Sequence, residues 1–286
     1  MRSGFDGPRR APIASGALPE LTDLDAYLAR IEHHGDVSLA SLHRSHATTV
    51  PFENFDSSAG RAVSLAPEQL EDKLVARRRG GYCFEQNMLF MAALRSIHVD
   101  EVEPMLARVR SDATSEPGPL NHLVLRVVVH GEPWLADVGF GGGGLLDPMP
   151  FAVGVECDQS GWRYRIVEEG AEMVVQVHQD GAWSGVYGFV PAPVAMVDIE
   201  VSNWYTSTHP SSPFVTGVLA GARRVESCLA FYQFDEPTLV DRQLGQSPVI
   251  TVVGRAEVPA LFLERFGIAD VVVDADGRAA IGDAPT

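Results

Sequence analysis

One cysteine, Cys83, stands where the sequence changes from a basic, glycine-containing run into a predicted helix. Residues 77–82 are three arginines, two glycines and a tyrosine, and apolar residues after them recur at spacings of three and four, which is typical of one buried helix face. Cys83 is therefore expected in the first helical turn, where free N–H groups and the helix dipole stabilise a thiolate. The glycines allow a sharp turn and a close approach by a substrate. We expect Cys83 to attack an acyl group and to hold it.

A cysteine nucleophile needs a base, and the base needs a group that orients it. His122 begins one predicted strand and Asp137 lies in the next, on either side of His130-Gly131. If this dipeptide forms a two-residue turn, Val129 pairs with Glu132, and His122 and Asp137 become diagonal neighbours on one face, about 7–8 Å apart. A register shifted by an odd number of residues would separate them onto opposite faces.

Each of these residues also has a purely structural interpretation. A buried cysteine is more often a small apolar side chain than a nucleophile, and a histidine at a strand start is more often structural than catalytic. Asp137 favours the catalytic interpretation, because it lies among apolar residues and a buried carboxylate needs a partner. The arginine run could be a solvated helix end or a cluster of ion pairs. The glycine run 141–144 could be a flexible loop or a place where backbone N–H groups approach phosphates.

The elements that position these residues change in character along the chain. Apolar spacing predicts helices at residues 18–33, 37–47, 66–75 and from Cys83 to about 98. Alternating patterns and turn dipeptides predict strands at residues 103–110, 122–129, 134–140, 162–168, 172–179 and 183–190, which is typical of a barrel or sandwich. The remainder is mixed: a helix at 194–205, strands within 214–234 and at 249–253, a helix at 257–266, and a loose tail after residue 274.

Composition narrows the class of protein. The chain has 286 residues with 45% hydrophobic and 21% charged residues, as in a globular protein of one large or two to three small domains. Its net charge of −16 argues against a nucleic-acid or membrane-surface partner. No apolar run approaches the ~20 residues of a membrane span, and the N-terminus lacks a signal-peptide pattern. Three dispersed cysteines predict neither a disulfide framework nor a metal site, and they fit a reducing cytoplasm.

Taken together, the motifs resemble those of the arylamine N-acetyltransferases, and the chain is similar to a bacterial member of that family. The resemblance rests on five segments in the family's order, covering about residues 21–266: Pro51-Phe52-Glu53-Asn54, the run from Arg79 to Asn87, Asn121-His122-Leu123, Asp137 to Gly141, and Ser207-Thr208-His209-Pro210 with Ser212-Pro213-Phe214. It implies an α+β fold with a cysteine-protease-like catalytic core. The expected parts are a disordered segment 1–17, a helical bundle 18–98, a β-barrel 99–193 and an α/β lid 194–286.

The resemblance also implies the chemistry. It implies a Cys83–His122–Asp137 triad that transfers an acetyl group from acetyl-CoA, through an acetyl-cysteine, to an arylamine, arylhydrazine or arylhydroxylamine, with no metal and a role in xenobiotic metabolism. Positions that match the substrate and CoA regions of the family are Tyr82, Gly139, Phe140, Gly141, Thr208 and Phe214, of which Phe140 and Phe214 match the acceptor pocket.

Three other classes of protein remain open from the sequence. An amide synthase that closes macrolactams has the same triad and architecture. A Cys-His-Asp hydrolase or transglutaminase-like enzyme would use the same groups on another acceptor. A non-catalytic small-molecule binder on this scaffold would not need all three triad residues.

Overall fold

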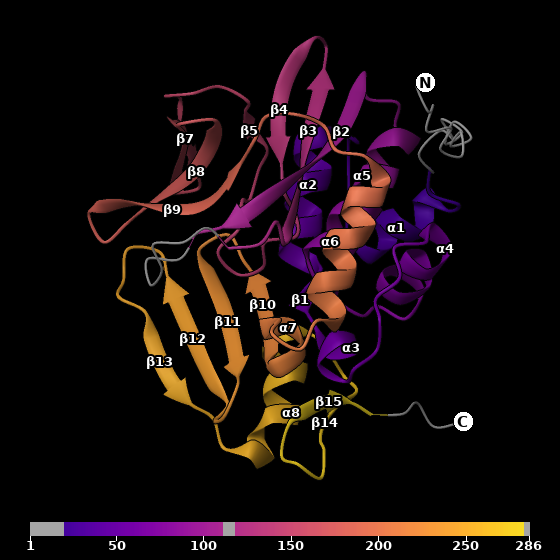
Figure 1. The fold of residues 1–286 in the computed structure, drawn as a ribbon, viewed down its shortest axis with the longest axis vertical. Coiled ribbons are helices and arrows are strands. Elements are labelled where there is room, and N and C mark those ends of the chain that lie inside the picture. The colour runs from indigo at the N-terminus through magenta and orange to yellow at the C-terminus, as the bar shows by residue number, and fades with distance from the viewer. Residues whose placement is uncertain (1–19, 111–117, 283–286) are drawn as a thin grey trace, which may run out of the picture.

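The computed structural model describes residues 20–110 and 118–282. The segment 1–17, predicted to be disordered, lies outside these residues. The chain forms a cluster of helices, a curved antiparallel sheet and a second sheet, and Figure 1 shows these parts meeting near the centre of the molecule. No helix in the described part is both long and apolar enough to cross a membrane.

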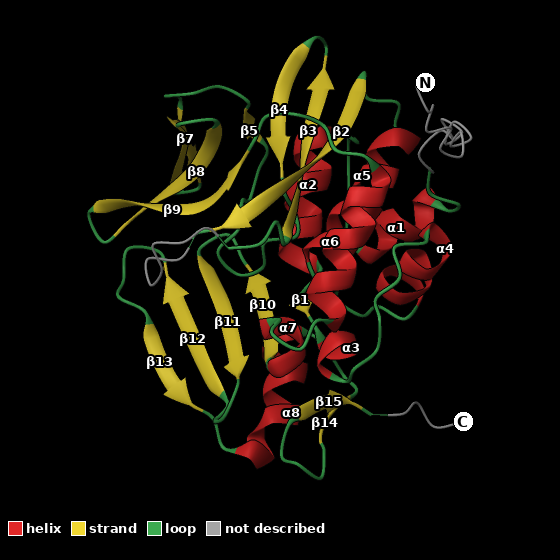
Figure 2. Cartoon of the chain, in the orientation of Figure 1, coloured by secondary structure: helices red, strands yellow, loops and turns green. Residues whose placement is uncertain are grey.

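The helices gather on one side of both sheets (Figure 2). Their bounds are α1 (Leu24–Arg30), α2 (Leu39–Thr49), α3 (Phe55–Ser58), α4 (Pro67–Leu70), the π-helix η1 (Glu71–Ala76), α5 (Cys83–Ser96), α6 (Met196–Thr208), α7 (Pro213–Thr216), the 3-10 helix η2 (Arg255–Glu257), α8 (Val258–Leu261) and the π-helix η3 (Phe262–Phe266). A capping box of Ser38 and Ser41 starts α2, which satisfies N–H groups that have no partner inside the helix.

Helix α5 is buried on all sides. Every residue from Cys83 to Leu94 is buried, whereas its apolar spacing predicts one buried face. The reason is its position, since α5 packs against α1, α2 and α4 and against strands β2 and β3 of the curved sheet. A helix enclosed in this way is a rigid support for the cysteine at its first position.

The curved sheet has eight antiparallel strands and nearly closes into a barrel (Figure 1). In spatial order its strands are β5 (Met149–Pro150), β4 (Glu132–Ala136), β3 (His122–Val129), β2 (Glu101–Val109), β9 (Ala182–Phe189), β8 (Glu172–Gln179), β7 (Trp162–Glu169) and β6 (Glu156–Gln159). The turn between β3 and β4 has φ of 53° at His130 and 80° at Gly131, as a type I′ hairpin requires. Val129 pairs with Glu132, so the predicted register is confirmed.

The second sheet includes a strand from the N-terminal part of the chain. Its order is β1 (Phe52–Glu53), β10 (Val218–Arg223), β11 (Ser227–Gln233), β12 (Thr238–Gln243) and β13 (Val249–Val252). Strand β1 pairs with β10, and Phe52 also bridges to Gly81. The segment before Cys83 is therefore held directly against the second sheet.

Several predicted elements have other bounds in the structure. The helix expected at 18–33 is α1, which spans Leu24–Arg30. The strand expected at 134–140 ends at Ala136, because the next N–H groups bond to side chains instead of a neighbouring strand. Phe214 lies in the short helix α7 and not in a strand, since Ser212 caps that helix and Pro213 begins it. The tail expected to be loose after residue 274 contains β15 (Ala279–Ile281), paired with β14 (Val271–Val273).

Candidate active site

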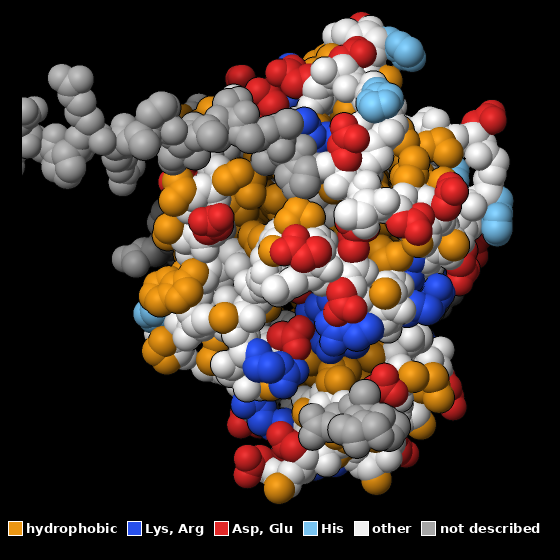
Figure 3. All heavy atoms as spheres, turned by 90° about the vertical axis from the view of Figure 1, so that its right-hand side faces the viewer, with side chains coloured by type: hydrophobic (Ala, Val, Ile, Leu, Met, Phe, Trp, Pro, Cys, Tyr) orange, Lys and Arg blue, Asp and Glu red, His pale blue; other side chains and the backbone are white. Residues whose placement is uncertain are grey.

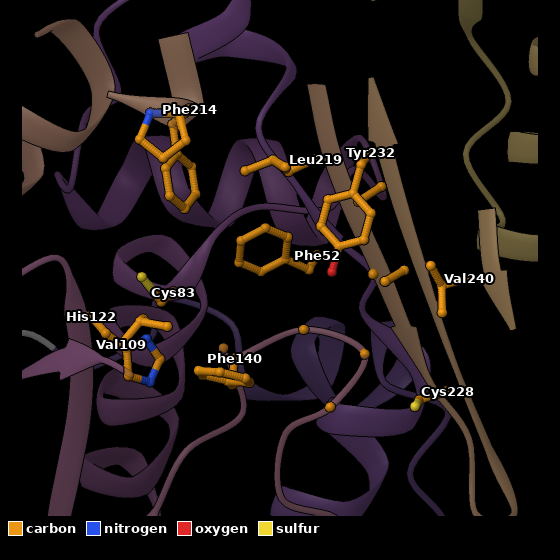
Figure 4. Close-up of a pocket in the computed structure, with 18 of the residues that line it drawn as sticks. Phe52, Cys83, Val109, His122, Phe140, Phe214, Leu219, Cys228, Tyr232 and Val240 are labelled. Atoms are coloured by element: carbon orange, nitrogen blue, oxygen red, sulfur yellow. The ribbon is translucent and has the colours of Figure 1, made fainter. Parts of the chain in front are cut away.

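Cys83 is the first residue of α5 and lies at the wall of a cavity of about 460 Å³. The sulfur lies 3.5 Å from the backbone oxygen of Asn121, and Figure 4 shows it next to the imidazole of His122. The helix begins here because Glu85, in its first turn, accepts a hydrogen bond from Tyr82 N–H at 3.0 Å, as in a capping box. The structure therefore places the thiol at a helix N-terminus, as the sequence predicts.

His122 and Asp137 meet across the β3–β4 hairpin. His122 is the first residue of β3, and Asp137 directly follows the last residue of β4. Nε2 of His122 donates to Oδ2 of Asp137 at 2.8 Å, and both side chains are almost fully buried. With Nε2 engaged, Nδ1 is the ring nitrogen left to face Cys83. The structure thus brings together the three residues that the sequence singles out for nucleophile, base and orienting group.

Asp137 makes His122 a stable cation. Burial alone lowers the pKa of His122, but the charge and hydrogen bond of Asp137, with a further contribution from Cys83, raise it to about 10. Burial raises the pKa of Asp137, yet hydrogen bonds from His122, Asn87 and Gly139 hold it below its usual value. At neutral pH the site holds an imidazolium beside the sulfur, the environment in which cysteines react as thiolates.

Asn87, one helical turn after Cys83, joins the nucleophile helix to the hairpin. Its Nδ2 donates to Asp137 Oδ1 at 2.9 Å and to Leu123 O at 2.7 Å, while its Oδ1 accepts from Val138 N–H at 3.0 Å. Gly139 N–H also donates to Asp137 Oδ1 at 3.0 Å. One amide side chain therefore fixes the distance between the helix that carries Cys83 and the hairpin that carries His122 and Asp137.

His43 on α2 is a second buried histidine at the site, and the sequence did not predict its role. Its Nε2 accepts a hydrogen bond from the backbone N–H of Asp137 at 3.0 Å, and its Nδ1 lies 3.0 Å from Leu146 O. An N–H can only donate and a carbonyl can only accept, so these partners determine the neutral tautomer with the proton on Nδ1. Burial lowers the pKa of His43, which keeps that tautomer neutral. The sequence did indicate that His43 would be bonded to other groups. His43 falls on the predicted apolar face of its helix, and a buried polar group needs hydrogen-bond partners.

A network of charges lies beneath the start of α5. Its members, buried or half-buried, are Glu53, Asp56, Lys73, Arg79 and Glu85. Arg79 contacts Glu53 at 2.6 Å, and Lys73 contacts Glu85 at 2.7 Å. Both interpretations of the arginine run therefore apply. Arg77 and Arg78 are exposed, whereas Arg79 is buried in the network of ion pairs. The network ties the segment with Glu53 to the segment with Cys83.

Asn54 positions a cavity wall. Its Nδ2 donates to Phe214 O at 2.8 Å and to Gly217 O at 2.9 Å, and its Oδ1 accepts from Leu219 N–H at 2.7 Å. These bonds hold the turn of α7 that carries Phe214. The aromatic part of the cavity wall comes from Phe52, Phe140, Phe214 and Tyr232.

The structure brings four of the six predicted substrate and CoA residues to the cavity wall. These are Gly139, Phe140, Gly141 and Phe214. Tyr82 and Thr208 are not among the described lining residues. Tyr82 is fully buried behind Cys83, where its hydroxyl bonds to Asn203. Thr208 is the last residue of α6 and its hydroxyl bonds back to Trp204 O at 2.5 Å.

The glycines of the loop after Asp137 allow the parts of the molecule to touch through their backbones. A Cβ on Gly139 would lie 2.7 Å from Cys83 Cα, which is closer than real Cβ atoms come. A Cβ on Gly142 would overlap Leu229 O, and one on Gly221 would lie 2.6 Å from Gly142 N. The glycine run is therefore a packing contact with the second sheet.

No group of three His, Cys, Asp or Glu side chains in the described part of the chain is placed to hold a metal ion.

Comparisons with known proteins agree with this site. A family model described as N-acetyltransferase matches residues 37–274. The arylamine N-acetyltransferase of Mycolicibacterium smegmatis is 36% identical over 257 residues, which cover 86% of this chain and 92% of that protein. A Salmonella typhimurium protein named arylamine N-acetyltransferase / N-hydroxyarylamine O-acetyltransferase is 36% identical over 177 residues, or 62% of this chain and 63% of its own.

Solved structures show the same likeness in three dimensions. The structure of Mycobacterium marinum arylamine N-acetyltransferase in complex with CoA has a TM-score of 0.80 and 32% identity, and the match covers 86% of this chain and 93% of that one. Together with the α+β fold and the cysteine at the start of α5, these matches confirm the resemblance that the motifs show. The chain belongs to the arylamine N-acetyltransferase family and is an acyltransferase.

Proposed function

We propose that the protein transfers acetyl groups from acetyl-CoA to arylamines, arylhydrazines and arylhydroxylamines by a ping-pong reaction on Cys83. The observation that carries the proposal is the Cys83–His122–Asp137 arrangement in one cavity with aromatic walls. The CoA bound to the Mycobacterium marinum relative supports a CoA thioester as donor, and the name of the Salmonella relative supports N-hydroxyarylamines among the acceptors.

In the first half-reaction, the Cys83 thiolate attacks the thioester carbonyl and forms a carbon–sulfur bond. As the tetrahedral intermediate collapses, the bond to the CoA sulfur breaks, and His122 gives its proton to that leaving sulfur. CoA departs as a thiol and Cys83 keeps the acetyl group. His122 is now neutral, and Asp137 holds the ring so that Nδ1 stays directed at the reacting atoms.

In the second half-reaction, the acceptor nitrogen or hydroxylamine oxygen attacks the acetyl-cysteine. His122 takes the proton that the acceptor loses, and Asp137 stabilises the imidazolium that forms. The carbon–sulfur bond to Cys83 breaks and the thiolate–imidazolium pair is restored. Because one nucleophile takes the acetyl group from the donor and then passes it to the acceptor, ping-pong kinetics are expected.

The cavity supports the choice of acceptor. Phe52, Phe140 and Phe214 line it close to Cys83 (Figure 4), and its volume of about 460 Å³ lies in the usual range for small-molecule sites. Aromatic walls favour flat aromatic amines, because rings stack edge-to-face or offset. We also propose a role in xenobiotic metabolism, and a cytoplasmic location in which the thiol stays reduced.

Intact-protein mass after incubation with acetyl-CoA alone tests the proposal. The wild type should gain one acetyl group and release one equivalent of CoA, and Cys83→Ala should gain none while keeping its far-UV circular dichroism. Cys157→Ala, which changes a cysteine on β6 away from the cavity wall, is the matched control and should be acetylated. An acetylated Cys83→Ala protein would refute the mechanism, and steady CoA release without an amine would show a hydrolase.

A further inference from the structure

Strand β13 ends the second sheet on an open edge. It pairs with β12 on one side and with no described strand on the other, and Figure 1 shows it at the outer end of the sheet, away from the helices. Its side chains Val249, Ile250 and Val252 are 62%, 67% and 64% exposed. Natural sheet edges are usually protected by charged side chains, prolines or a covering element, whereas β13 reads Val-Ile-Thr-Val. An apolar edge of this kind is a template for another strand.

The backbone of β13 has hydrogen-bonding groups that point outward. Val253 N–H donates to Pro237 O on the β12 side at 2.8 Å, and the pairing with β12 keeps one register along the whole of β13. In an antiparallel ladder, alternate residues direct both N–H and C=O to the same side. Thr251 therefore faces β12, as Val253 does. Ile250 and Val252 direct their N–H and C=O groups to the open edge.

These outward groups fit a second copy of the same strand. If two copies of β13 run antiparallel about a two-fold axis at Thr251, Ile250 of one copy lies opposite Val252 of the partner subunit, and the reverse pair forms as well. Each pair can exchange both of its N–H···O bonds. Opposite residues then lie on one face of a continuous sheet, which a register shifted by one residue would not allow. Closed two-fold contacts of this kind are the commonest in homo-oligomers.

Charge also favours a second copy at this edge. The chain carries −16, so two copies repel each other wherever their acidic surfaces meet. Residues 243–254 contain no Asp, Glu, Lys or Arg, so two copies can approach at this edge without bringing like charges together. Pairing there also removes the exposed apolar side chains of β13 from water, which favours association.

We propose that the protein forms a two-fold dimer in which β13 pairs with β13 of a second copy, so that the second sheets of both copies become one. A four-residue edge makes a small contact of the weak, reversible class, and the dissociation constant should be on the order of 10 μM. None of the described β13 residues lines the Cys83 cavity, so both active sites stay open in the dimer. The inference goes beyond the proposed function and does not depend on it, because its test measures mass and not acetyl transfer.

Sedimentation velocity of the whole chain between about 1 and 300 μM, a range that brackets the expected dissociation constant, tests the proposal. The wild type should change from the mass of one chain to that of two. Ile250→Lys places a charge on the edge of each copy and should stay monomeric with an unchanged kcat per chain. Val201→Lys, at a 61% exposed position on α6, is the matched control and should dimerise as the wild type does. A wild type that is monomeric throughout would overturn the dimer and point to a strand of another protein, and an Ile250→Lys protein that dimerises fully would overturn the edge as its interface.

Two cysteine variants at exposed positions test the register. Thr251→Cys places two thiols opposite each other at the axis, in a non-hydrogen-bonded pair whose Cα atoms lie about 4.5 Å apart, within the range of a disulfide. Oxidised glutathione should therefore link this variant into a covalent dimer on a non-reducing gel. In Val249→Cys the two thiols lie about 14 Å apart along the strands and should not link, and the wild type controls for the native cysteines. Equal linkage in both variants, or linkage in neither, would overturn this pairing.

Discussion

The proton on His122 depends on a single carboxylate. Burial acts to remove this proton, and Asp137 more than offsets burial, so the pKa lies at about 10 instead of near 6.5. Because the pKa is raised, the proton is held throughout the neutral range and is lost only as pH rises through about 10. The positive charge next to Cys83 should therefore disappear when Asp137 loses its charge.

Asp137→Asn should slow alkylation of Cys83 by iodoacetamide at pH 7 by at least about 10-fold, since without the carboxylate burial lowers the pKa of His122 and the imidazole becomes neutral. Peptide mass spectrometry would separate Cys83 from Cys157 and Cys228. Asp235→Asn, at an exposed position, is the control and should react at the wild-type rate. An unchanged rate in Asp137→Asn would contradict the ion pair.

His43 offers a test in which two substitutions each keep one of its hydrogen bonds. His43→Gln keeps an oxygen at the position that accepts Asp137 N–H, whereas His43→Asn keeps a nitrogen at the position that donates to Leu146 O. A buried N–H left without a partner costs about 1–3 kcal/mol, and in His43→Asn that N–H belongs to the residue that orients His122. We expect kcat to fall about 10-fold further in His43→Asn than in His43→Gln, with the alkylation rate of Cys83 falling in parallel. Equal kcat values with unequal melting temperatures would show a role in stability alone.

At the scale of elements, α5 and the loop after β4 touch through their backbones at Gly139. A methyl group there would push Cys83 away from the hairpin that carries its base, and misplacement by about 1 Å can cost 100-fold in rate. Gly139→Ala should therefore lower kcat/KM by about 10- to 100-fold. Gly118→Ala, where a Cβ would meet nothing within 4 Å, is the matched control. Full activity in Gly139→Ala would show that the loop can shift at no cost to the reaction.

The charge network beneath α5 should be costly to break. Lys73→Met leaves three carboxylates with Arg79 and with the exposed Arg61, which pairs with Asp56. Removing one partner of a buried ion pair typically costs about 3–5 kcal/mol. Burial raises the pKa of Glu85 to about 7 even with Lys73 present, so its contribution favours folding at low pH and is lost as pH rises from about 4.5 through 7. Denaturant unfolding should show a deficit in Lys73→Met that grows from pH 5 to pH 8.

Adding Glu85→Gln to Lys73→Met should restore part of that stability, because the amide keeps the hydrogen bond from Tyr82 N–H and removes the uncompensated charge. A deficit that is independent of pH, or no recovery in the double variant, would show that packing and not charge explains the loss.

Elements whose partners are close in sequence were predictable. The β3–β4 hairpin depends on the type I′ turn at His130-Gly131, so its register and the His122–Asp137 pair follow from local chemistry. Contacts between distant segments were not predictable. The sequence carries no local sign that β1 joins the second sheet or that α5 is enclosed on all sides. The positions of Tyr82 and Thr208 depend in the same way on how α6 packs.

At the scale of the whole molecule, the site lies where all three parts meet. The helices supply Cys83, the curved sheet supplies His122, and the second sheet supplies part of the cavity wall. The three cores of buried side chains are separate clusters, and they are joined at the site by hydrogen bonds and glycine contacts. Small changes in how the parts dock should therefore affect the reaction before they affect folding.

The charge of the whole molecule opposes its proposed donor, because the chain carries −16 and CoA is an anion. The charge is uneven, however: on the face in Figure 3, acidic side chains are spread widely and most basic ones gather in a band below the middle. At 0.15 M salt, charges more than about 8 Å apart are largely screened. The charges nearest the cavity should then dominate, and Arg242 is the one Lys or Arg among the described residues that line it. We expect kcat/KM for acetyl-CoA to fall as NaCl rises from 0.1 to 0.5 M in the wild type, because salt screens this attraction. The fall should be shallower in Arg242→Gln, and S-acetylpantetheine, which lacks the nucleotide and the pyrophosphate, should show little dependence on salt in either protein. A rise with salt in the wild type would mean that the overall negative charge, and not Arg242, governs the approach of the donor.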